Sequence, residues 1–541
     1  MIDKTQNEAR IETDVAIVGY GPVGQALAAM LARAGHRVDV FERFTDIYRL
    51  PRAVHLDHEI MRLLQSLGLA DGLADEMIPV DDYQWFGADG KPLLRFDRKG
   101  IASSGWEASY MFFQPELEGA LERAGCAEPT VTVHRGWFAD AFADSDNGAE
   151  LTVRRVDDGF GGLSLSGDRR VVRARWLVGA DGANSVVRDA SGITRRDLGF
   201  QERWLVVDAE PADMGVLAHL PIACQWCDPA RPTTQMQSGP RHRRWEFMLL
   251  PHEQRSDFED TDRVWSLLAP WYTPQDGPLT RSTVYEFRSM LANEMRKGHV
   301  LLVGDSAHLT PPFLGQGLCS GLRDAANLAW KLDLVLRGVT SKQLLDTIDP
   351  ERQPHNEAVI RLAIELGKVL CELDPRAAAE RDAMLRAAAP PPPLALPPLT
   401  GGLLHRRSDG GLDPLAGALS VQGVVARAGR EGRFDDVVGG GVQLIVADGD
   451  PLDGVDTGTR ALLDTLDASI ASLSSDAPYG VEDRDGRLTD WLAGHGAHAV
   501  LVRPDFYVFG SAASAEAIAH LLDDLRTQLL ITTPTTSGAP T

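Results

Sequence analysis

The first forty residues alternate between apolar runs and polar turns in a pattern that predicts a strand, a helix and a second strand. Residues 14–18 (DVAIV) form a short apolar run, and residues 25–35 (QALAAMLARAG) carry apolar side chains at helical spacing. A second short apolar run follows at 37–43 (RVDVFER). This β-turn-α-β order, complete in about 30 residues, is the opening unit of a parallel sheet covered by helices.

The period of the pattern changes further along the chain. Residues 76–104 alternate aromatic and polar side chains and predict a hairpin, and the alternating segments between 130 and 180 predict a β-meander. Residues 196–289 are rich in Trp, Arg and β-branched residues and predict a separate, mainly antiparallel layer. The pattern then predicts a buried strand before the Gly304 turn and a long amphipathic helix over 317–338.

A proline-rich segment, AAAPPPPLALPPLTGG (387–402), divides the chain. Its six prolines lack the backbone N–H that a helix interior or a central strand requires, so we expect a linker. The region that follows, 403–530, combines apolar runs with amphipathic helical segments. It predicts a small α/β sandwich.

Composition narrows the classes of function. The chain has 541 residues, 54 basic and 77 acidic, and a formal net charge of −23, which repels phosphate backbones, so we expect no nucleic-acid partner. The apolar stretch 15–32 is broken by glycine and proline, and the polar N-terminus lacks the apolar core of a signal peptide, so we expect no membrane association. Five cysteines are an odd, sparse set that fits a reducing compartment, and we expect a cytoplasmic protein.

A glycine fingerprint, GYGPVG (19–24), lies between the first strand and the first helix. Gly19 permits a tight turn, Gly21 lets the backbone approach a pyrophosphate, and Gly24 allows close packing of helix on strand. The helix N-terminus supplies free N–H groups for the phosphates, and Glu42 stands where a carboxylate would accept hydrogen bonds from a ribose. The fingerprint predicts dinucleotide binding against the alternative of a glycine turn without a ligand, and by itself it does not separate NAD from FAD.

Two later motifs carry a family resemblance. GADGANSVVR (179–188) and GDSAH followed by two prolines (304–312) occur in the same order as in single-component FAD-dependent aromatic hydroxylases, which the chain resembles. Within that family it is most similar to the 3-(3-hydroxyphenyl)propionate hydroxylases, through the segments 51–69, 226–251 and 315–332. The resemblance covers roughly residues 12–370 and, more weakly, the C-terminal unit.

The resemblance implies a set of cofactor-binding residues. Asp305 would contact the ribityl–pyrophosphate region of FAD, and Asp181 belongs to the segment that handles FAD and the nicotinamide cofactor. Gln114 would contact the flavin, and Arg52 would lie near the isoalloxazine. The backbone N–H groups of the loop at the start of the long helix would face the flavin N1/C2 carbonyl and stabilise the anionic reduced ring, and these residues are Gly317, Leu318 and Cys319.

The resemblance and the patterns together predict an α/β protein with a Rossmann-like FAD-binding domain, a mainly antiparallel β substrate domain and a C-terminal thioredoxin-like domain. No cysteine follows Cys371, so this last domain has no dithiol chemistry. If the protein is a homodimer, we expect this C-terminal domain to form the dimer interface. The expected boundaries are 1–75, 105–195 and 290–386 for the FAD-binding domain, 76–104 and 196–289 for the middle domain, 387–402 for the linker and 403–530 for the thioredoxin-like domain.

Candidate residues on the substrate side follow from their chemistry. His55 and Asp57 would help to deprotonate a phenol, because a histidine titrates near neutral pH; the alternative is an ordinary helix entrance. Arg288 is a catalytic candidate, with a surface position as the alternative. One arginine of a middle-domain cluster would grip a substrate carboxylate unless the cluster lies on a sheet edge; its members are Arg231, Arg241, Arg243 and Arg244. Cys224 and Cys227 have no companion pair, so we expect buried thiols and no metal site.

The predicted activity is that of a monooxygenase that uses FAD, NADH or NADPH, and O2. In the family that the chain resembles, the hydroxyl group is delivered from a C4a-hydroperoxyflavin to a phenol ring, and the protein excludes water from the site. The first substrate to consider is 3-(3-hydroxyphenyl)propionate, which would give the 2,3-dihydroxy product. Two alternatives stay open: a tailoring hydroxylase of a larger polyketide-like phenol, and an FAD-binding protein without turnover.

Overall fold

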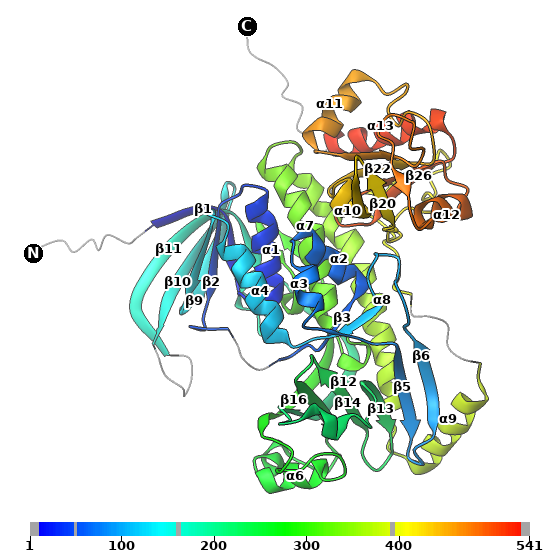
Figure 1. Ribbon diagram of the computed structural model, residues 1–541. Helices are drawn as coiled ribbons and strands as arrows, with labels where there is room; N and C mark the ends of the chain where they lie inside the picture. The colour runs from blue at the N-terminus through cyan, green and yellow to red at the C-terminus, as the bar shows by residue number, and fades with distance from the viewer. Residues whose placement is uncertain (1–9, 48–50, 158–163, 390–394, 532–541) are drawn as a thin grey trace, which may run out of the picture.

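The structure, a computed structural model, describes residues 10–47, 51–157, 164–389 and 395–531. The chain forms a mixed α/β protein with a helix-covered sheet at the left of Figure 1, a second, mainly antiparallel sheet below and a smaller α/β unit at the upper right. This confirms the predicted fold class.

The first sheet has eight strands, and its main path runs β17-β18-β11-β1-β2-β8. The β1, β2, β8, β11 and β18 strands are parallel, whereas β9 and β10 extend β11 as an antiparallel meander. The strands are β1 (Arg10–Val18), β2 (Val38–Glu42), β8 (Val131–Arg135), β9 (Trp137–Ser145), β10 (Gly148–Asp157), β11 (Ser164–Gly179), β17 (Arg296–Lys297) and β18 (Val300–Leu302).

Helices cover this sheet because its central strand is buried on both faces. Val15, Ala16 and Ile17 of β1 are fully buried, and Leu27 and Leu31 of the first helix pack in the same core cluster. The α1 helix packs against both α4 and α7, near the centre of Figure 1. The helices of the first two units are α1 (Pro22–Arg33), α2 (His58–Ser66), α3 (Ala70–Ala74), α4 (Gln114–Cys126), α5 (Val186–Ala190), α6 (Thr261–Leu268), α7 (Gly317–Leu336), α8 (Ile348–Leu370) and α9 (Pro375–Ala387).

The second sheet lies below the first in Figure 1 and follows the order β19-β16-β12-β15-β14-β13-β5-β6. Its neighbours are antiparallel except for the β5–β13 pair, which brings the predicted hairpin onto the sheet of the later segment. The strands are β5 (Asp82–Gly87), β6 (Pro92–Asp97), β12 (Arg195–Ala209), β13 (Ala223–Cys227), β14 (Thr233–Ser238), β15 (His242–Met248), β16 (Leu279–Ala292) and β19 (His308–Leu309). A small sheet joins the two units through β3 (His55–Asp57), β4 (Ile78–Pro79) and β7 (Ser109–Met111).

The C-terminal unit has a four-stranded sheet in the order β23-β22-β25-β26. The β22 and β23 strands are parallel around α11, and β25 and β26 form an antiparallel pair followed by α13, the arrangement that a thioredoxin-like core requires. Its elements are β20 (Val424–Arg427), β21 (Arg430–Arg433), α10 (Phe434–Val437), β22 (Gln443–Val446), α11 (Thr457–Thr465), β23 (Ser469–Ser472), β24 (Glu482–Asp483), α12 (Arg487–Gly494), β25 (Ala499–Val502), β26 (Val508–Ala512) and α13 (Ala515–Ile531).

Part of the expected linker is packed. Residues 390–394 lie outside the described residues, but Leu399 is 1% exposed and shares a core cluster with Leu404 and Tyr507 of the C-terminal unit. This apolar side chain, directly after the last proline, therefore holds this end of the segment against the protein. The domain boundaries given above stay a prediction.

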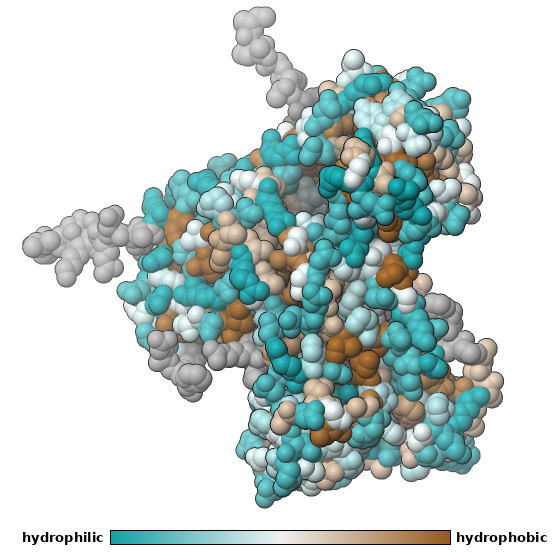
Figure 2. All heavy atoms as spheres, in the orientation of Figure 1, coloured by the Kyte–Doolittle hydropathy of each residue, from teal (hydrophilic) through white to brown (hydrophobic). Residues whose placement is uncertain are grey.

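The outer surface is polar over most of the face in Figure 2, where hydrophilic side chains surround smaller apolar patches. Among the described residues, no helix has the length and the apolar composition needed to cross a bilayer.

Candidate active site

A single cavity of about 410 Å³ connects the edge of the first sheet with the face of the second. On one side it is lined by the glycine fingerprint and the start of α7, and on the other by strands of the second sheet. Of the predicted site residues, ten line it: Gly19, Gly21, Glu42, Arg52, His55, Gln114, Asp181, Asp305, Gly317 and Leu318.

The fingerprint glycines are needed where they stand. Gly19 has φ of +100°, and a Cβ there would lie 2.3 Å from the carbonyl oxygen of Ala180. A Cβ on Gly24 would lie 2.2 Å from the carbonyl oxygen of Gly19, so α1 packs directly on the turn. A Cβ on Gly21 would meet no protein atom within 4 Å, and this residue faces the cavity. The turn and the N-terminus of α1 therefore form an open cradle suited to a pyrophosphate.

Three carboxylates stand around this cradle. The Glu42 carboxylate accepts hydrogen bonds from the backbone N–H of Tyr20 (2.8 Å) and of Phe44 (2.9 Å), which fixes it at the end of β2 beside the cavity. Asp181 accepts from Ser185 Oγ at 2.5 Å, and burial raises its pKa. Asp305 is exposed at the cavity, and no described residue donates a hydrogen bond to its carboxylate.

Gln114 holds the segment that carries Arg52. Its Oε1 accepts from the backbone N–H of Arg52 and of Ala53, both at 2.7 Å, and its Nε2 donates to Glu118 at 2.6 Å. Gln114 is 3% exposed, at the first turn of α4, where Pro115 follows it. The side chain thus positions the Arg52 backbone at the cavity wall.

The start of α7 faces the cavity through Gly317 and Leu318, but Cys319 does not line it. The Cys319 thiol is buried and donates to the carbonyl oxygen of His55 at 3.7 Å, and burial raises its pKa well above the usual value. Its side chain therefore lies behind the wall, linking α7 to β3. Gly315, with φ of +68°, comes so close to His55 that a Cβ would lie 3.0 Å from Nδ1.

His55 is held in one neutral form. Nδ1 lies 3.1 Å from the carbonyl oxygen of Gly315, which only accepts, so Nδ1 carries the proton. Nε2 is then the acceptor, 2.8 Å from Ser109 Oγ and 3.2 Å from Arg98 Nη1. Burial and the nearby Arg98 lower the pKa of His55 to about 4. The expectation that His55 titrates near neutral pH is therefore corrected: the ring is uncharged there.

Asp57 lies outside the cavity lining. One oxygen caps α2 by accepting from the backbone N–H of Ile60 (3.2 Å), and the other accepts from Arg323 Nη2 at 2.5 Å. Arg323 also binds Glu59 at 2.6 Å and the Gln316 amide oxygen at 2.9 Å. The Arg323 charge holds the pKa of Asp57 well below its usual range. Asp57 is therefore a fixed anion behind the wall and not an acceptor that faces a substrate.

Arg288 points away from the cavity. It lies on β16, pairs with Glu286 at 2.9 Å and has a side chain that is 46% exposed. Strand alternation places Tyr285 and Phe287 on the opposite face, where both line the cavity. This geometry gives Arg288 the surface position and not the catalytic one.

Of the four clustered arginines, only Arg244 lines the cavity. Its guanidinium pairs with Asp208 at 2.7 Å and donates to the carbonyl oxygens of Arg52 (2.8 Å) and Pro51. Arg231 is held by Glu253 at 2.8 Å. The N–H groups of Arg244 therefore bind protein groups, and we do not expect this residue to bind a substrate carboxylate.

Four residues that line the cavity are not among those that the sequence predicts: Tyr83, Arg98, Glu246 and Arg281. Strand alternation predicts the position of Glu246, because residues two apart on a strand share a face and Arg244 is a candidate site residue. Arg98 follows the hairpin and reaches the cavity only because that hairpin joins the second sheet.

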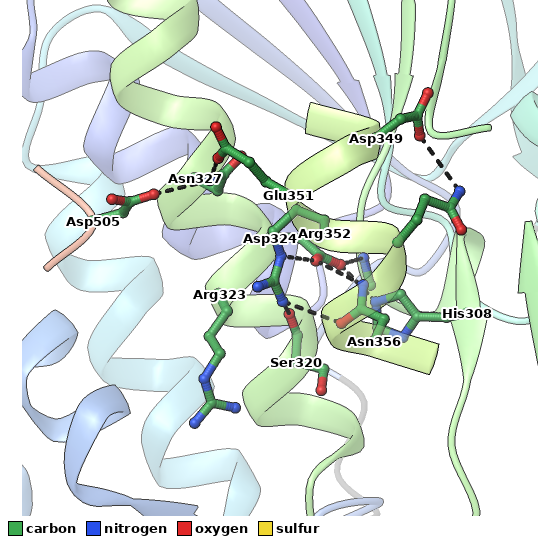
Figure 3. A network of polar contacts seen from close by, with 12 residues as sticks. His308, Ser320, Arg323, Asp324, Asn327, Asp349, Glu351, Arg352, Asn356 and Asp505 are labelled. Atoms are coloured by element: carbon green, nitrogen blue, oxygen red, sulfur yellow. Dashed lines mark hydrogen bonds and ion pairs between the residues drawn. The ribbon is translucent and has the colours of Figure 1, made fainter. Parts of the chain in front are cut away.

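The loop of the third motif is anchored from behind by a buried polar network (Figure 3). Asp324 on α7 accepts from the backbone N–H of Gly304 (3.0 Å) and pairs with His308 Nε2 (2.6 Å). Its other oxygen accepts from Arg352 (2.8 Å) and Asn356 (3.2 Å) on α8. These partners hold the pKa of Asp324 well below its usual range. His308 therefore fixes the loop, whose residues Asp305 and Thr310 line the cavity.

Cys224 and Cys227 are buried thiols, and burial raises the pKa of each to about 12. Over the described part of the chain, no group of three or more His, Cys, Asp or Glu side chains is placed to hold a metal ion.

A nucleotide cradle that opens into a partly apolar cavity against a second sheet defines a dinucleotide-dependent enzyme of small molecules. The FAD binding domain family model matches residues 12–363, and the HcaD C-terminal domain model matches residues 417–528. The chain belongs to the single-component FAD-dependent aromatic hydroxylases, a family of monooxygenases.

Relatives are similar over nearly the whole chain. A "probable NADH-specific resorcinol 4-hydroxylase" of Rhodococcus jostii is 40% identical over 526 residues, 95% of each chain. A 3-(3-hydroxy-phenyl)propionate/3-hydroxycinnamic acid hydroxylase of Burkholderia cenocepacia is 32% identical over 532 residues, 94% of this chain and 95% of the relative.

Solved structures share the fold. The flavin-dependent monooxygenase PieE, solved with FAD and substrate, superimposes with a TM-score of 0.77 at 22% identity, covering 96% of this chain and 99% of the other. Aklavinone-11 hydroxylase, in a ternary complex with FAD and aklavinone, gives a TM-score of 0.75 at 25% identity with the same coverage.

Proposed function

We propose that this protein hydroxylates a small phenol, with NADH as the electron source and O2 as the source of the new oxygen atom. The observation that carries the proposal is the single cavity that joins the nucleotide cradle to the face of the second sheet. A cofactor bound at one end and an aromatic ring at the other would share one continuous space. NADH is chosen because the relative at 40% identity is described as specific for it.

The residues around the cradle fit FAD. The open space at Gly21 and the N-terminus of α1 suit the pyrophosphate, and Glu42 keeps lone pairs for a ribose. The remaining residues that we assign to the cofactor are Gly19, Gly24, Arg52, Gln114, Asp181, Asp305, Gly317 and Leu318. Cys319 supports the loop from behind and does not itself reach the cavity.

The chemistry that bound FAD supplies in this family is the activation of O2, so that one oxygen atom enters an aromatic ring and the other leaves as water. The chain has to bind the phenol, favour its ionised form and exclude water. Arg98, half-buried beside His55, favours negative charge on a phenolic oxygen held near it. Neutral His55 adds no charge of its own and fixes the wall through Gly315. Val206, Met236 and Phe287 supply apolar surface against the ring.

Two substrates are the first to test. The relative at 40% identity is named for resorcinol, and that at 32% for 3-(3-hydroxyphenyl)propionate. We place resorcinol first, because Arg244, the arginine expected to bind a substrate carboxylate, is occupied by Asp208 and a backbone carbonyl.

The test is NADH oxidation by the purified FAD-loaded protein with and without each phenol, following hydroxylated product and H2O2. We expect stimulation by resorcinol with product formed nearly one for one with NADH. Stimulation with H2O2 as the main product would reject that phenol as the substrate. No stimulation by resorcinol, 3-(3-hydroxyphenyl)propionate or a panel of larger phenols would overturn the proposed function.

A further inference from the structure

Glu246 is a buried carboxyl group on the cavity wall. It lies on β15 beside Val206 of β12 and Thr234 of β14, and it is 5% exposed. The small surface that it keeps belongs to the cavity, which it lines together with Met236 and Phe287. A carboxylate in this apolar surrounding is costly unless something binds it.

The nearby cations are already committed to another carboxylate. Asp208 pairs with Arg244 at 2.7 Å and with Arg281 at 2.8 Å, and all three side chains are about 2% exposed. Arg244 further donates to the carbonyl oxygens of Arg52 and Pro51. These contacts leave Arg244 little capacity for another anion, whereas Nε of Arg281 has no hydrogen-bond partner among the described residues.

Glu246 itself is left under-satisfied. Its one ion pair, to Arg244, is long at 3.7 Å, and no residue in the described ranges donates a hydrogen bond to its carboxylate. Burial raises its pKa, because the Arg244 charge compensates only part of the desolvation. The neighbouring polar groups satisfy one another instead: Thr234 donates to Gln225, and Gln225 donates to Tyr83. An acceptor is therefore present on the cavity wall without a donor.

We propose that Glu246 determines substrate specificity by accepting a hydrogen bond from a donor substituent on the aromatic ring, such as a second hydroxyl group, and by rejecting rings that carry a carboxylate there. The donor would complete the coordination of a buried acceptor, whereas an anion would meet a like charge in a medium of low dielectric. This inference rests on the proposed function and adds to it the residue that selects among phenols.

The test compares three phenols that differ only at the meta position: resorcinol, 3-methoxyphenol and 3-hydroxybenzoate. For the natural chain we expect kcat/KM for resorcinol to exceed that for 3-methoxyphenol by about tenfold or more, because the ether cannot donate, and 3-hydroxybenzoate to be poorer still. Glu246→Gln keeps the size and removes the charge. We expect it to lower kcat/KM for resorcinol by about tenfold and to raise that for 3-hydroxybenzoate.

The matched control is Glu286→Gln, a half-exposed carboxylate on β16 whose partner is Arg288. This variant should leave the ratios of kcat/KM among the three phenols unchanged. An unchanged resorcinol-to-hydroxybenzoate ratio in Glu246→Gln would overturn the inference. If that variant does not retain FAD, the natural chain decides: equal or better turnover of 3-hydroxybenzoate than of resorcinol would refute it. If the natural chain turned over none of the phenols, that result would instead count against the proposed function.

Discussion

At the scale of single residues, burial decides chemistry more than residue type does. His55 is a candidate base in the sequence because histidine ordinarily titrates near neutral pH. In the structure the residue is 7% exposed and lies beside Arg98. Its pKa falls to about 4, so its role at neutral pH is that of a fixed hydrogen-bonding group. Glu246 shows the opposite direction, since burial raises its pKa.

The pKa of His55 predicts a dependence of stability on pH. A pKa lowered in the folded state from 6.5 to about 4 gives stability that is present above pH 6.5 and lost as the pH falls towards 4. At pH 5 the loss from this residue is about 2 kcal/mol. His55→Asn keeps a donor towards Gly315 and does not titrate. Urea unfolding at pH 7.5 and pH 5 should show that the natural chain loses about 2 kcal/mol more than the variant.

Exposed His252 provides the control for that measurement. His252→Asn should lose as much stability between the two pH values as the natural chain does. An equal loss in His55→Asn and the natural chain would show that His55 is not buried in its neutral form.

At the scale of elements, α7 organises the site from behind. Its Arg323 binds Asp57 and Glu59 at the start of α2 and Gln316 in the loop before α7 itself. One side chain therefore joins β3, which carries His55, to the loop that faces the cavity.

Arg323→Met should remove these contacts between β3, α2 and the loop before α7. It leaves Asp57 and Glu59 buried without their cation, which predicts a loss of about 3–5 kcal/mol in the free energy of unfolding. FAD binding, measured by flavin fluorescence, should weaken as well, because Gln316 loses its partner. The control is Arg337→Met, directly after the last residue of α7, where the side chain is 40% exposed and its pair with Asp333 should matter by no more than about 1 kcal/mol. Equal losses for the two variants would contradict this role.

The elements were largely predictable from the sequence, whereas the site was predictable only in part. Local periodicity gave the opening β-α-β unit and the helix after Gly317, because neighbours in the chain make both. Arg98, Glu246 and Arg281 line one cavity through pairing between distant strands, which no local pattern contains. Arg288 illustrates the finer limit: a shift of one residue along β16 separates the cavity face from solvent.

At the scale of the whole molecule, the C-terminal unit is docked through buried polar contacts. Arg62 of α2 is 0% exposed, pairs with Asp435 at 2.6 Å and lies over the ring of Phe506. Deeper in the interface, Arg503 pairs with Glu351 of α8 at 2.6 Å, where Lys331 of α7 binds the same carboxylate. These contacts attach the unit to α2 and α8, and Glu351 of α8 is also held by Lys331 of α7.

Removing one of these contacts should uncouple the unit. Arg62→Met leaves Asp435 without its buried cation, and we expect the C-terminal unit to unfold before the rest, so that one urea transition becomes two. Arg484→Met, at a half-exposed pair within the C-terminal unit, should keep a single transition. A single, unshifted transition in Arg62→Met would contradict docking through this pair.

The central claim, that the protein inserts an oxygen atom from O2 into a small phenol, is tested most directly with isotopically labelled O2. The FAD-loaded protein is given NADH and resorcinol under labelled gas, and the product is weighed by mass spectrometry. The account predicts one labelled oxygen atom in each new hydroxyl group. A product that carries oxygen from water, or NADH oxidation that yields only H2O2 with every phenol, would contradict it.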